Sequence, residues 1–352
     1  MGCGDISIST KLPKFIRRAI FGGDTGFPSS VPVVSPDYVK NEIIEAILYL
    51  QRLPEDIART YPNYILIGPP GIGKTQVVYE ASREAAERLG RVFVDITDHR
   101  ARARVVEELE KDPSASEKHF LFLDLRLTEV EPYDITGVPR DAGRYTEYKP
   151  MAWAYALSLA PGVLFLDELT NIQDPEVRAA SLKIIYDKAA GFVRMHPRLF
   201  IACAGNLPTQ SSLAEVLPEP VVNRLQIFYV TAGSIDSWAR VVSRKISSIA
   251  DKKTRKRYEE TLALVIDFHR RTNGRYLLQL PRERRQDANE NFATPRTWEG
   301  FVLTTPIDRL RAMARTGDGA MLYAHLTSLL GASVAKEFIA YLKGRLDSGD
   351  NG

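Results

Sequence analysis

One short motif restricts the possible folds of this 352-residue chain more than any other feature. Residues 68–75 read GPPGIGKT and match the pattern G-x-x-x-x-G-K-[ST] at every position. The run 64–67 before the motif is apolar and favours a β-strand, and residues from about 74 to 89 have a helical pattern. A glycine-rich loop between a strand and a helix binds phosphate well, because backbone N–H groups and the helix N-terminus face the anion. The motif therefore predicts a phosphate-binding loop.

The side chains of this loop predict how a nucleoside triphosphate and Mg²⁺ would be held. We expect Lys74 to reach the β- and γ-phosphates and the Thr75 hydroxyl to ligate Mg²⁺. A glycine-rich turn without a ligand is the alternative, and the complete match between a strand and a helix argues against it. The predicted nucleotide-binding residues are Gly68, Pro69, Pro70, Gly71, Ile72, Gly73, Lys74, Thr75 and Gln76.

A second apolar strand ends in two carboxylates. Residues 163–169 read VLFLDEL. Asp167 is predicted to lie beside Thr75 and hold Mg²⁺ through water, while Glu168 orients or deprotonates the attacking water. Taken alone, two carboxylates at a strand end are equally consistent with ordinary surface residues and with a catalytic pair. Together with the upstream phosphate loop, they indicate a catalytic pair.

The pattern of elements divides the chain into three expected parts. Strand and helix patterns alternate over residues 36–230, which is typical of a parallel α/β sheet. After Thr231 the patterns are helical, at about 234–250, 254–272, 297–315 and 318–345, with a polar loop at 273–293. We therefore expect an N-terminal arm at 1–35, an α/β nucleotide-binding core at 36–231 and a helical domain at 232–352.

Composition excludes several classes of protein. Lys plus Arg number 47 and Asp plus Glu 44, a net charge of +3, so a strongly basic or acidic tail is not a global feature. The two cysteines, Cys3 and Cys203, form neither a disulfide framework nor a metal-ligand spacing, which favours a reducing, cytoplasmic location. The longest apolar stretch, 150–166, is short and broken by Pro161-Gly162, so we expect no membrane span.

The order of these motifs resembles that of AAA+ ATPases. After GPPGIGKT and LFLDEL, the segment LFIACAGNLP (199–208) resembles the sensor 1 strand with Asn206 at its polar end. PEPVVNRLQIFYV (218–230) resembles the segment that carries an arginine finger, here Arg224. TPRTWE (294–299) resembles sensor 2, with Arg296. The resemblance implies a core with a parallel five-stranded sheet, a small helical lid, and ATP with Mg²⁺ as cofactors.

Each of these three residues has a functional and a plain interpretation. Asn206 would position the lytic water through its amide, or would cap a turn before Leu207-Pro208. Arg224 would act in trans on the nucleotide of a neighbouring subunit, or would form a surface ion pair. Arg296 would reach the γ-phosphate in cis from the lid, or would simply begin a helix after Pro295.

Residues 127–139, LTEVEPYDITGVP, resemble the MoxR branch of AAA+ proteins. This resemblance implies a chaperone-like ring, expected to be a hexamer, that remodels a protein partner such as a von Willebrand factor A domain protein. Residues 137–150 lie where MoxR relatives insert a hairpin, and Tyr145, Tyr148 and Lys149 are candidates for contact with a client. The sequence departs from the branch at Asn223-Arg224-Leu225, where Asp-Arg-Phe is common, and in the additional strand and helix of 91–118.

Two other functions stay open at this stage. The basic clusters KKTRKR (252–257) and RERR (282–285) would suit a nucleic-acid motor, although solvated surface is the preferred interpretation at a net charge of +3. A switch that binds ATP without hydrolysing it is the other alternative. The set of Lys74, Asp167, Glu168, Asn206 and Arg224 argues against it, because it contains every expected catalytic part.

Overall fold

The computed structural model describes residues 33–280, 291–343 and 345–346. The described chain separates into two compact units. The first contains the residues up to Pro69 together with Lys74–Thr231, and the second contains Pro70–Gly73 together with the residues from Ala232 onward. Apart from its last residues, the expected N-terminal arm lies outside the described part, as do Cys3 and the basic cluster 282–285.

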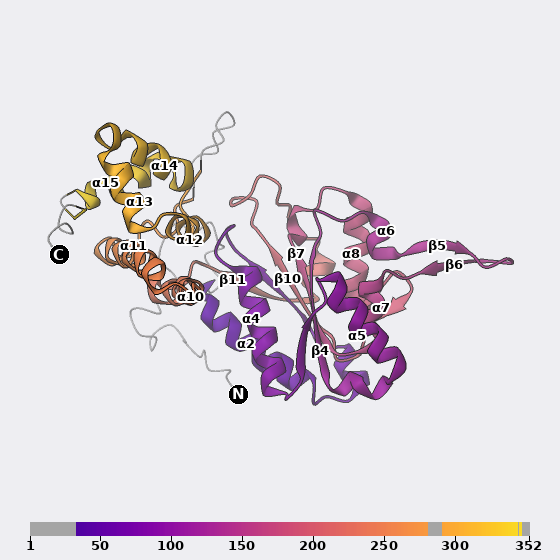
Figure 1. The fold of residues 1–352 in the computed structure, drawn as a ribbon. Helices are drawn as coiled ribbons and strands as arrows, with labels where there is room; N and C mark the ends of the chain where they lie inside the picture. The colour runs from indigo at the N-terminus through magenta and orange to yellow at the C-terminus, as the bar shows by residue number, and fades with distance from the viewer. Residues whose placement is uncertain (1–32, 281–290, 344, 347–352) are drawn as a thin grey trace, which may run out of the picture. The chain divides into compact units, whose positions relative to one another are not determined.

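The first unit is built on a seven-stranded sheet in which all paired neighbours are parallel (Figure 1). The sheet order is β1 (Val33–Val34), β11 (Leu225–Val230), β2 (Asn63–Ile67), β10 (Phe200–Gly205), β7 (Gly162–Asp167), β4 (His119–Arg126) and β3 (Val92–Asp95). The parallel α/β class is confirmed. The sheet has seven strands rather than the expected five, because β3 and β1 extend its two edges. A two-residue strand such as β1 is too short to show hydrophobic periodicity.

Helices cover both faces of this sheet. On one face, alternate strand residues such as Leu123 and Leu164 pack against α5 (His99–Lys111), α7 (Ala152–Leu159) and α8 (Pro175–Asp187). On the other face lie α2 (Pro36–Leu50) and α4 (Lys74–Arg88), where Tyr79 of α4 meets Phe122 of β4 edge to face. Burial on both faces explains why the central strands are continuous apolar runs.

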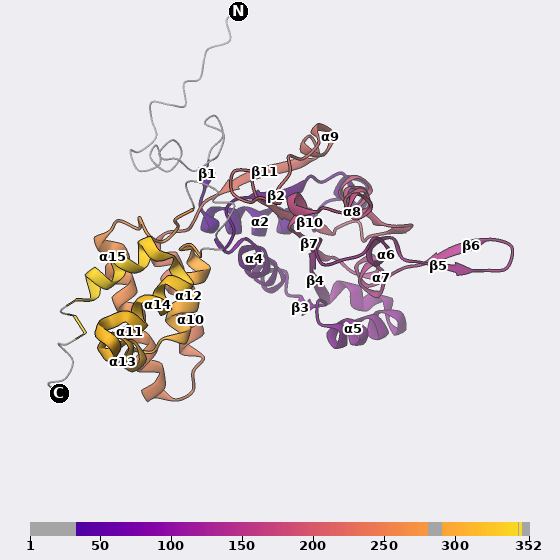
Figure 2. The ribbon, with the colours of Figure 1, turned by 90° about the horizontal axis from the view of Figure 1, so that it is seen from above.

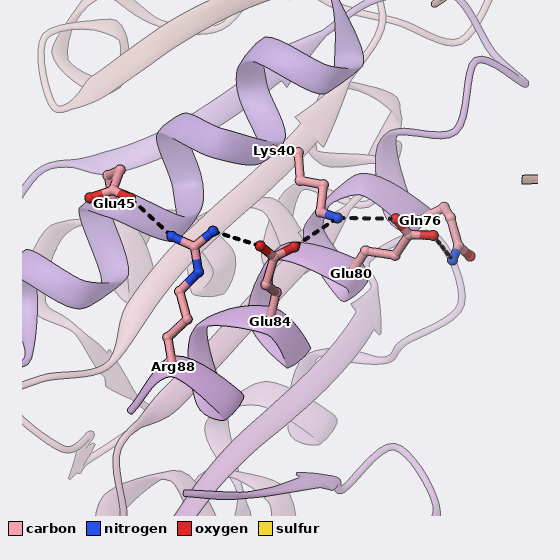
Figure 3. Close-up of polar contacts among 6 residues, drawn as sticks. All are labelled: Lys40, Glu45, Gln76, Glu80, Glu84 and Arg88. Carbon is pink, nitrogen blue, oxygen red and sulfur yellow. Dashed lines mark hydrogen bonds and ion pairs between the residues drawn. The ribbon is translucent and has the colours of Figure 1, made fainter. Parts of the chain in front are cut away.

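Helix α2 packs along α4, the helix that follows the phosphate loop. On the outer side of the pair, Lys40 Nζ lies 3.5 Å from a Glu80 oxygen and 2.9 Å from a Glu84 oxygen (Figure 3). Arg88 joins Glu84, at 2.7 Å, to Glu45, at 3.2 Å. Apolar packing beneath this row, rather than the partly exposed ion pairs, supplies most of the stability of the interface.

Short elements and two small hairpins complete the first unit. Strands β5 (Val138–Asp141) and β6 (Thr146–Lys149) pair antiparallel and extend away from the sheet, as Figure 2 shows from above. The hairpin expected within 137–150 is thus confirmed. The other elements are α3 (Glu55–Arg59), α6 (Pro132–Thr136), α9 (Glu219–Val222), β8 (Ala189–Ala190), β9 (Val193–Arg194) and 3₁₀ turns at Pro113–Glu117 and Leu169–Asn171.

The regular elements of the second unit, among its described residues, are all helices, joined by loops and turns. Its helices are α10 (Ile235–Ser247), α11 (Lys252–Arg271), α12 (Pro295–Thr304), α13 (Ile307–Arg315), α14 (Ala320–Leu330) and α15 (Ala332–Leu342), with a 3₁₀ turn at Thr316–Gly319. The helical segments expected at 297–315 and 318–345 are confirmed as helical, but each consists of two helices rather than one continuous one. Pro306 disfavours helical geometry at Thr305, and Gly331 has a φ of +83°. No helix in the described ranges is both long and apolar enough to cross a bilayer.

Candidate functional site

The glycine-rich loop has the backbone that its motif demands. It connects the end of β2 with the start of α4, and Gly71 and Gly73 have φ angles of +77° and +91°. A Cβ on Gly73 would meet no heavy atom within 4 Å. The requirement for glycine at position 73 is therefore conformational rather than steric, since other residues enter this left-handed region only with strain.

Lys74 is the first residue of α4 and folds back over the loop. Its Nζ donates to the carbonyl oxygens of Gly68, at 2.7 Å, and Pro69, at 3.0 Å. It also donates to Oδ1 of Asn206 at 3.0 Å. The ammonium group is thereby held above the loop, where a phosphate would be bound.

Thr75 and Asp167 bring together a hydroxyl and a carboxylate suited to Mg²⁺. The Thr75 hydroxyl donates to Oδ2 of Asp167 at 3.0 Å, although β10 lies between the strands that lead to these two residues. Asp167, at the end of β7, is only 8% exposed. Among the described residues no cluster of three or more His, Cys, Asp or Glu forms a metal cage. Mg²⁺ usually takes one or two protein oxygens together with water and phosphate oxygens, and the Thr75 hydroxyl and the Asp167 carboxylate could supply these protein oxygens.

Glu168 adopts an uncommon backbone conformation beside Asp167. Its φ of +62° and ψ of +32° place a non-glycine residue in the left-handed region, a strain that is often found at functional sites. Its carboxylate accepts a hydrogen bond from the Thr128 hydroxyl at 2.9 Å. Sequence reasoning had not singled out Thr128, although it lies in the segment 127–139 that carries the MoxR resemblance.

Asn206 follows β10 and lies between the phosphate loop and the acidic strand end. It is 8% exposed, and its backbone N–H donates to the Thr170 hydroxyl at 2.8 Å. Its side-chain oxygen accepts from Lys74. The turn that follows is closed instead by Gln210, whose side chain accepts from Leu207 N. The amide of Asn206 is therefore directed into the site rather than used as a turn cap.

A further carboxylate stands next to the site on β4. Burial and then the negative charge of Asp167 raise the pKa of Asp124 to about 6. Asp124 pairs in register with Phe165 of β7, and its backbone N–H donates to the Thr97 hydroxyl at 3.0 Å. Sequence reasoning missed this residue. Its signal was an acidic residue inside the apolar run of a strand.

The two predicted arginines, Arg224 and Arg296, lie in different parts of the structure. Arg224 directly precedes β11, at the end of the sheet opposite to the phosphate loop, and its guanidinium lies over the Tyr186 ring at 4.2 Å. Arg296 is an exposed residue in the first turn of α12. Within the second unit, its backbone N–H donates to Gly71 O at 3.1 Å. Gln76 is exposed, and its side chain donates to Glu80 at 3.0 Å.

Comparison with known proteins agrees with this arrangement. Residues 64–232 match the sequence model of the ATPase family associated with various cellular activities (AAA). The phosphate loop, the Asp167–Glu168 pair, Asn206 and Arg224 all lie in this segment, so the site belongs to an AAA domain, a domain type that binds nucleotides. No curated protein matches the sequence.

Two solved structures illustrate the matches to known structures. The match to the structure of PCH-2 from C. elegans covers 88% of this chain and 69% of the PCH-2 chain, at 13% identity and a TM-score of 0.36. The match to a Cytophaga hutchinsonii protein described as a putative ATPase covers 79% of this chain and 81% of that protein's chain, at 16% identity and a TM-score of 0.33. The parallel sheet followed by helices is an AAA+ P-loop fold.

Proposed function

We propose that this protein hydrolyses ATP with Mg²⁺ at the site formed by the loop 68–75, Asp167, Glu168 and Asn206. The observation that carries the proposal is the 3.0 Å contact between the Thr75 hydroxyl and the Asp167 carboxylate. Two oxygen-bearing side chains, Thr75 in the first turn of α4 and Asp167 at the end of β7, meet within a domain of an ATPase family. The preference for ATP over GTP comes from the family and not from any side chain of the site.

Each side chain has a definite task in this reaction. Lys74 binds the β- and γ-phosphates, while Thr75 and Asp167 hold Mg²⁺, directly or through water. The metal, when bound, would neutralise charge on the phosphates. Asn206 orients the attacking water through its amide, and Glu168 takes up the proton of that water. The hydrogen bond from Thr128 orients the Glu168 carboxylate before the water arrives.

Two variants test the hydrolytic proposal. Lys74→Ala is expected to abolish nucleotide binding, because the phosphates lose their counter-cation. Glu168→Gln is expected to bind ATP but to hydrolyse it very slowly, since an amide cannot accept the proton. Glu259→Gln, at an exposed position of α11, is the matched control and should keep wild-type turnover. Equal turnover in Glu168→Gln and the wild type would remove Glu168 from the mechanism.

The position of Arg224 supports assembly of several copies. The pairing of Leu225 with Asn63 places Arg224 beside the beginning of β2, whereas the phosphate loop follows its end, ~16 Å further along the strand. This separation from its own phosphate loop supports action of Arg224 on the nucleotide of a neighbouring subunit, and the resemblance to the MoxR branch implies a ring of six. Glu168→Gln with Mg²⁺-ATP should then have a native mass of about 240 kDa, six times 39.5 kDa. A monomer at all concentrations would contradict the ring.

The work of the ring is the remodelling of a protein partner, in the manner of the MoxR branch. Support comes from exposed aromatics on the two hairpins: Phe192, between β8 and β9, is 75% exposed, and its ring centre lies 5.1 Å from that of Tyr148 on β6. Lys183 Nζ lies 5.1 Å from the Phe192 ring centre. A protein with a von Willebrand factor A domain is one candidate client.

Phe192→Ala tests the contact with a client. This variant should lose stimulation of ATP turnover by a reduced, carboxymethylated polypeptide, while turnover without the polypeptide is kept. Unchanged stimulation would exclude the hairpin aromatics as the contact. Salt-sensitive binding of DNA, with no effect of the polypeptide, would favour the nucleic-acid motor instead. Of the two basic clusters that would suit such a motor, the one at 252–257 lies in the described part of the chain, at the start of α11. Arg257 in this cluster forms an ion pair with Asp308 at 3.0 Å.

A further inference from the structure

The backbone around Arg224 is fixed, whereas its side chain is exposed. The Arg224 N–H donates to Val221 O at 2.9 Å in the turn between α9 and β11. Val221 and Leu225 on either side are buried, with exposed fractions of 0% and 9%. The freedom of this residue therefore lies in its side chain, and whatever restrains that side chain decides where the guanidinium points.

The restraint on the guanidinium is an aromatic ring. The central carbon of the Arg224 guanidinium lies 4.2 Å from the ring centre of Tyr186, the residue before the last of α8. Within the described part of the chain, Arg224 makes no ion pair and its side chain makes no hydrogen bond. Arg178 on the same helix differs, because it donates to the Glu215 carboxylate at 2.6 Å and to Ile172 O.

This difference has a chemical consequence. The N–H donors of a guanidinium lie in its plane, so a ring stacked on one face orients the group without using any donor. A carboxylate partner such as Glu215 on Arg178 occupies a donor of the guanidinium and neutralises its charge. Arg224 is thus oriented and still able to bind an anion with all its side-chain N–H groups.

The end of α8 that carries Tyr186 is itself held in place by contacts with other elements. The Asn63 amide, at the start of β2, donates to the carbonyl oxygen of Ile185 at 2.8 Å, which ties the last turn of α8 to the sheet. Lys188 ends α8 in the left-handed conformation, and its Nζ donates to Ala58 O at 3.2 Å. The Tyr186 ring is also packed against the core of the first unit. A ring held in this way restrains a side chain stacked upon it.

We infer that Tyr186 is a positioning residue that holds Arg224 ready for the terminal phosphate of a nucleotide bound to a neighbouring copy of this chain. The inference rests on the proposed action of Arg224 in trans. Tyr186 touches neither nucleotide nor Mg²⁺ and acts only through Arg224. The ring face carries the interaction, and the Tyr186 hydroxyl has no hydrogen bond among the described residues.

The test compares Tyr186→Phe, which keeps the ring, with Tyr186→Leu, which removes it. Tyr49→Leu, an exposed aromatic on α2, is the matched control. We expect kcat of Tyr186→Leu to fall about two- to five-fold, equivalent to the roughly 0.5–1 kcal/mol of an exposed cation–π contact, with KM unchanged. Tyr186→Phe should restore most of the loss. A Phe variant as slow as the Leu variant would overturn the inference.

A double-mutant cycle separates positioning from general damage to the fold. In the Arg224→Ala background, Tyr186→Leu should cause no further loss, because the group that it positions is gone. The protein concentration for half-assembly of Glu168→Gln with Mg²⁺-ATP gives a second readout that needs no turnover. Tyr186→Leu should raise that concentration about two- to five-fold with Arg224 present and leave it unchanged without it. Additive effects in both readouts would overturn the inference.

The same experiments distinguish failure of the inference from failure of the proposed function. Wild-type turnover and assembly in Arg224→Ala would refute the trans role and the inference together. Impaired Arg224→Ala combined with unaffected Tyr186→Leu would refute the inference alone.

Discussion

Gly73→Ala is a small change whose effect can be worked out from the backbone. Gly73 has a φ of +91°, and an added Cβ would meet no atom within 4 Å, so the methyl group causes no clash. The cost is the left-handed conformation itself, about 1–2 kcal/mol for a residue with a Cβ. An alanine at position 73 is expected to leave the left-handed region in the free loop and to return to it on binding, so the Kd for ATP rises by the corresponding factor, roughly 5 to 30.

Equilibrium titration of Glu168→Gln with ATP, in the presence of Mg²⁺, measures this effect without hydrolysis. Gly300→Ala is the matched control, because an added Cβ there also meets open space, but the residue lies within helix α12. In a helix the same substitution should stabilise the protein by about 0.5–1 kcal/mol and leave the Kd unchanged. An unaltered Kd in Gly73→Ala would refute the argument that the conformation of this glycine is needed for binding.

Two further predictions concern stability. Ile43→Ala, at a fully buried position of α2, should lower the free energy of unfolding by about 2–5 kcal/mol in urea titrations, whereas Lys40→Met should change it by at most about 1 kcal/mol. Equal losses would contradict the argument that packing dominates this interface. Burial lowers the pKa of His269 to about 4, so its neutral form stabilises the fold and that stability is lost as pH falls below 6.5, where the unfolded chain takes up a proton. In His269→Phe the free energy of unfolding should therefore fall less steeply as the pH is lowered, by up to about 1.4 kcal/mol per pH unit. Urea titrations of both proteins between pH 7 and 5 measure this difference.

Much of the fold and of the site could be predicted because the signals are local. Lys74 and Thr75 follow one apolar run, Asp167 ends a second, and Asn206 follows a third. Parallel strands place their carboxyl ends at one edge of a sheet, so residues far apart in sequence meet there. The Thr75–Asp167 and Lys74–Asn206 contacts follow from this geometry.

Contacts between single side chains of different elements could not be predicted. Thr128, Thr170 and Tyr186 are isolated residues without a pattern, and their roles arise only when β4, the 3₁₀ turn after β7, and α8 pack beside other elements. The division of the segment 297–315 is a different case. Apolar periodicity continues across the break, but Pro306 was a signal that could have ended α12 at the right place.

The central claim is that one subunit supplies the Glu168 site and its neighbour supplies Arg224. The most direct measurement is ATP turnover by mixed assemblies of Glu168→Gln and Arg224→Ala subunits. Each variant alone should be nearly inactive. In the mixture, interfaces that combine an intact Glu168 with an intact Arg224 should restore turnover. A mixture with confirmed mixed assemblies that stays as inactive as either variant alone would contradict the account.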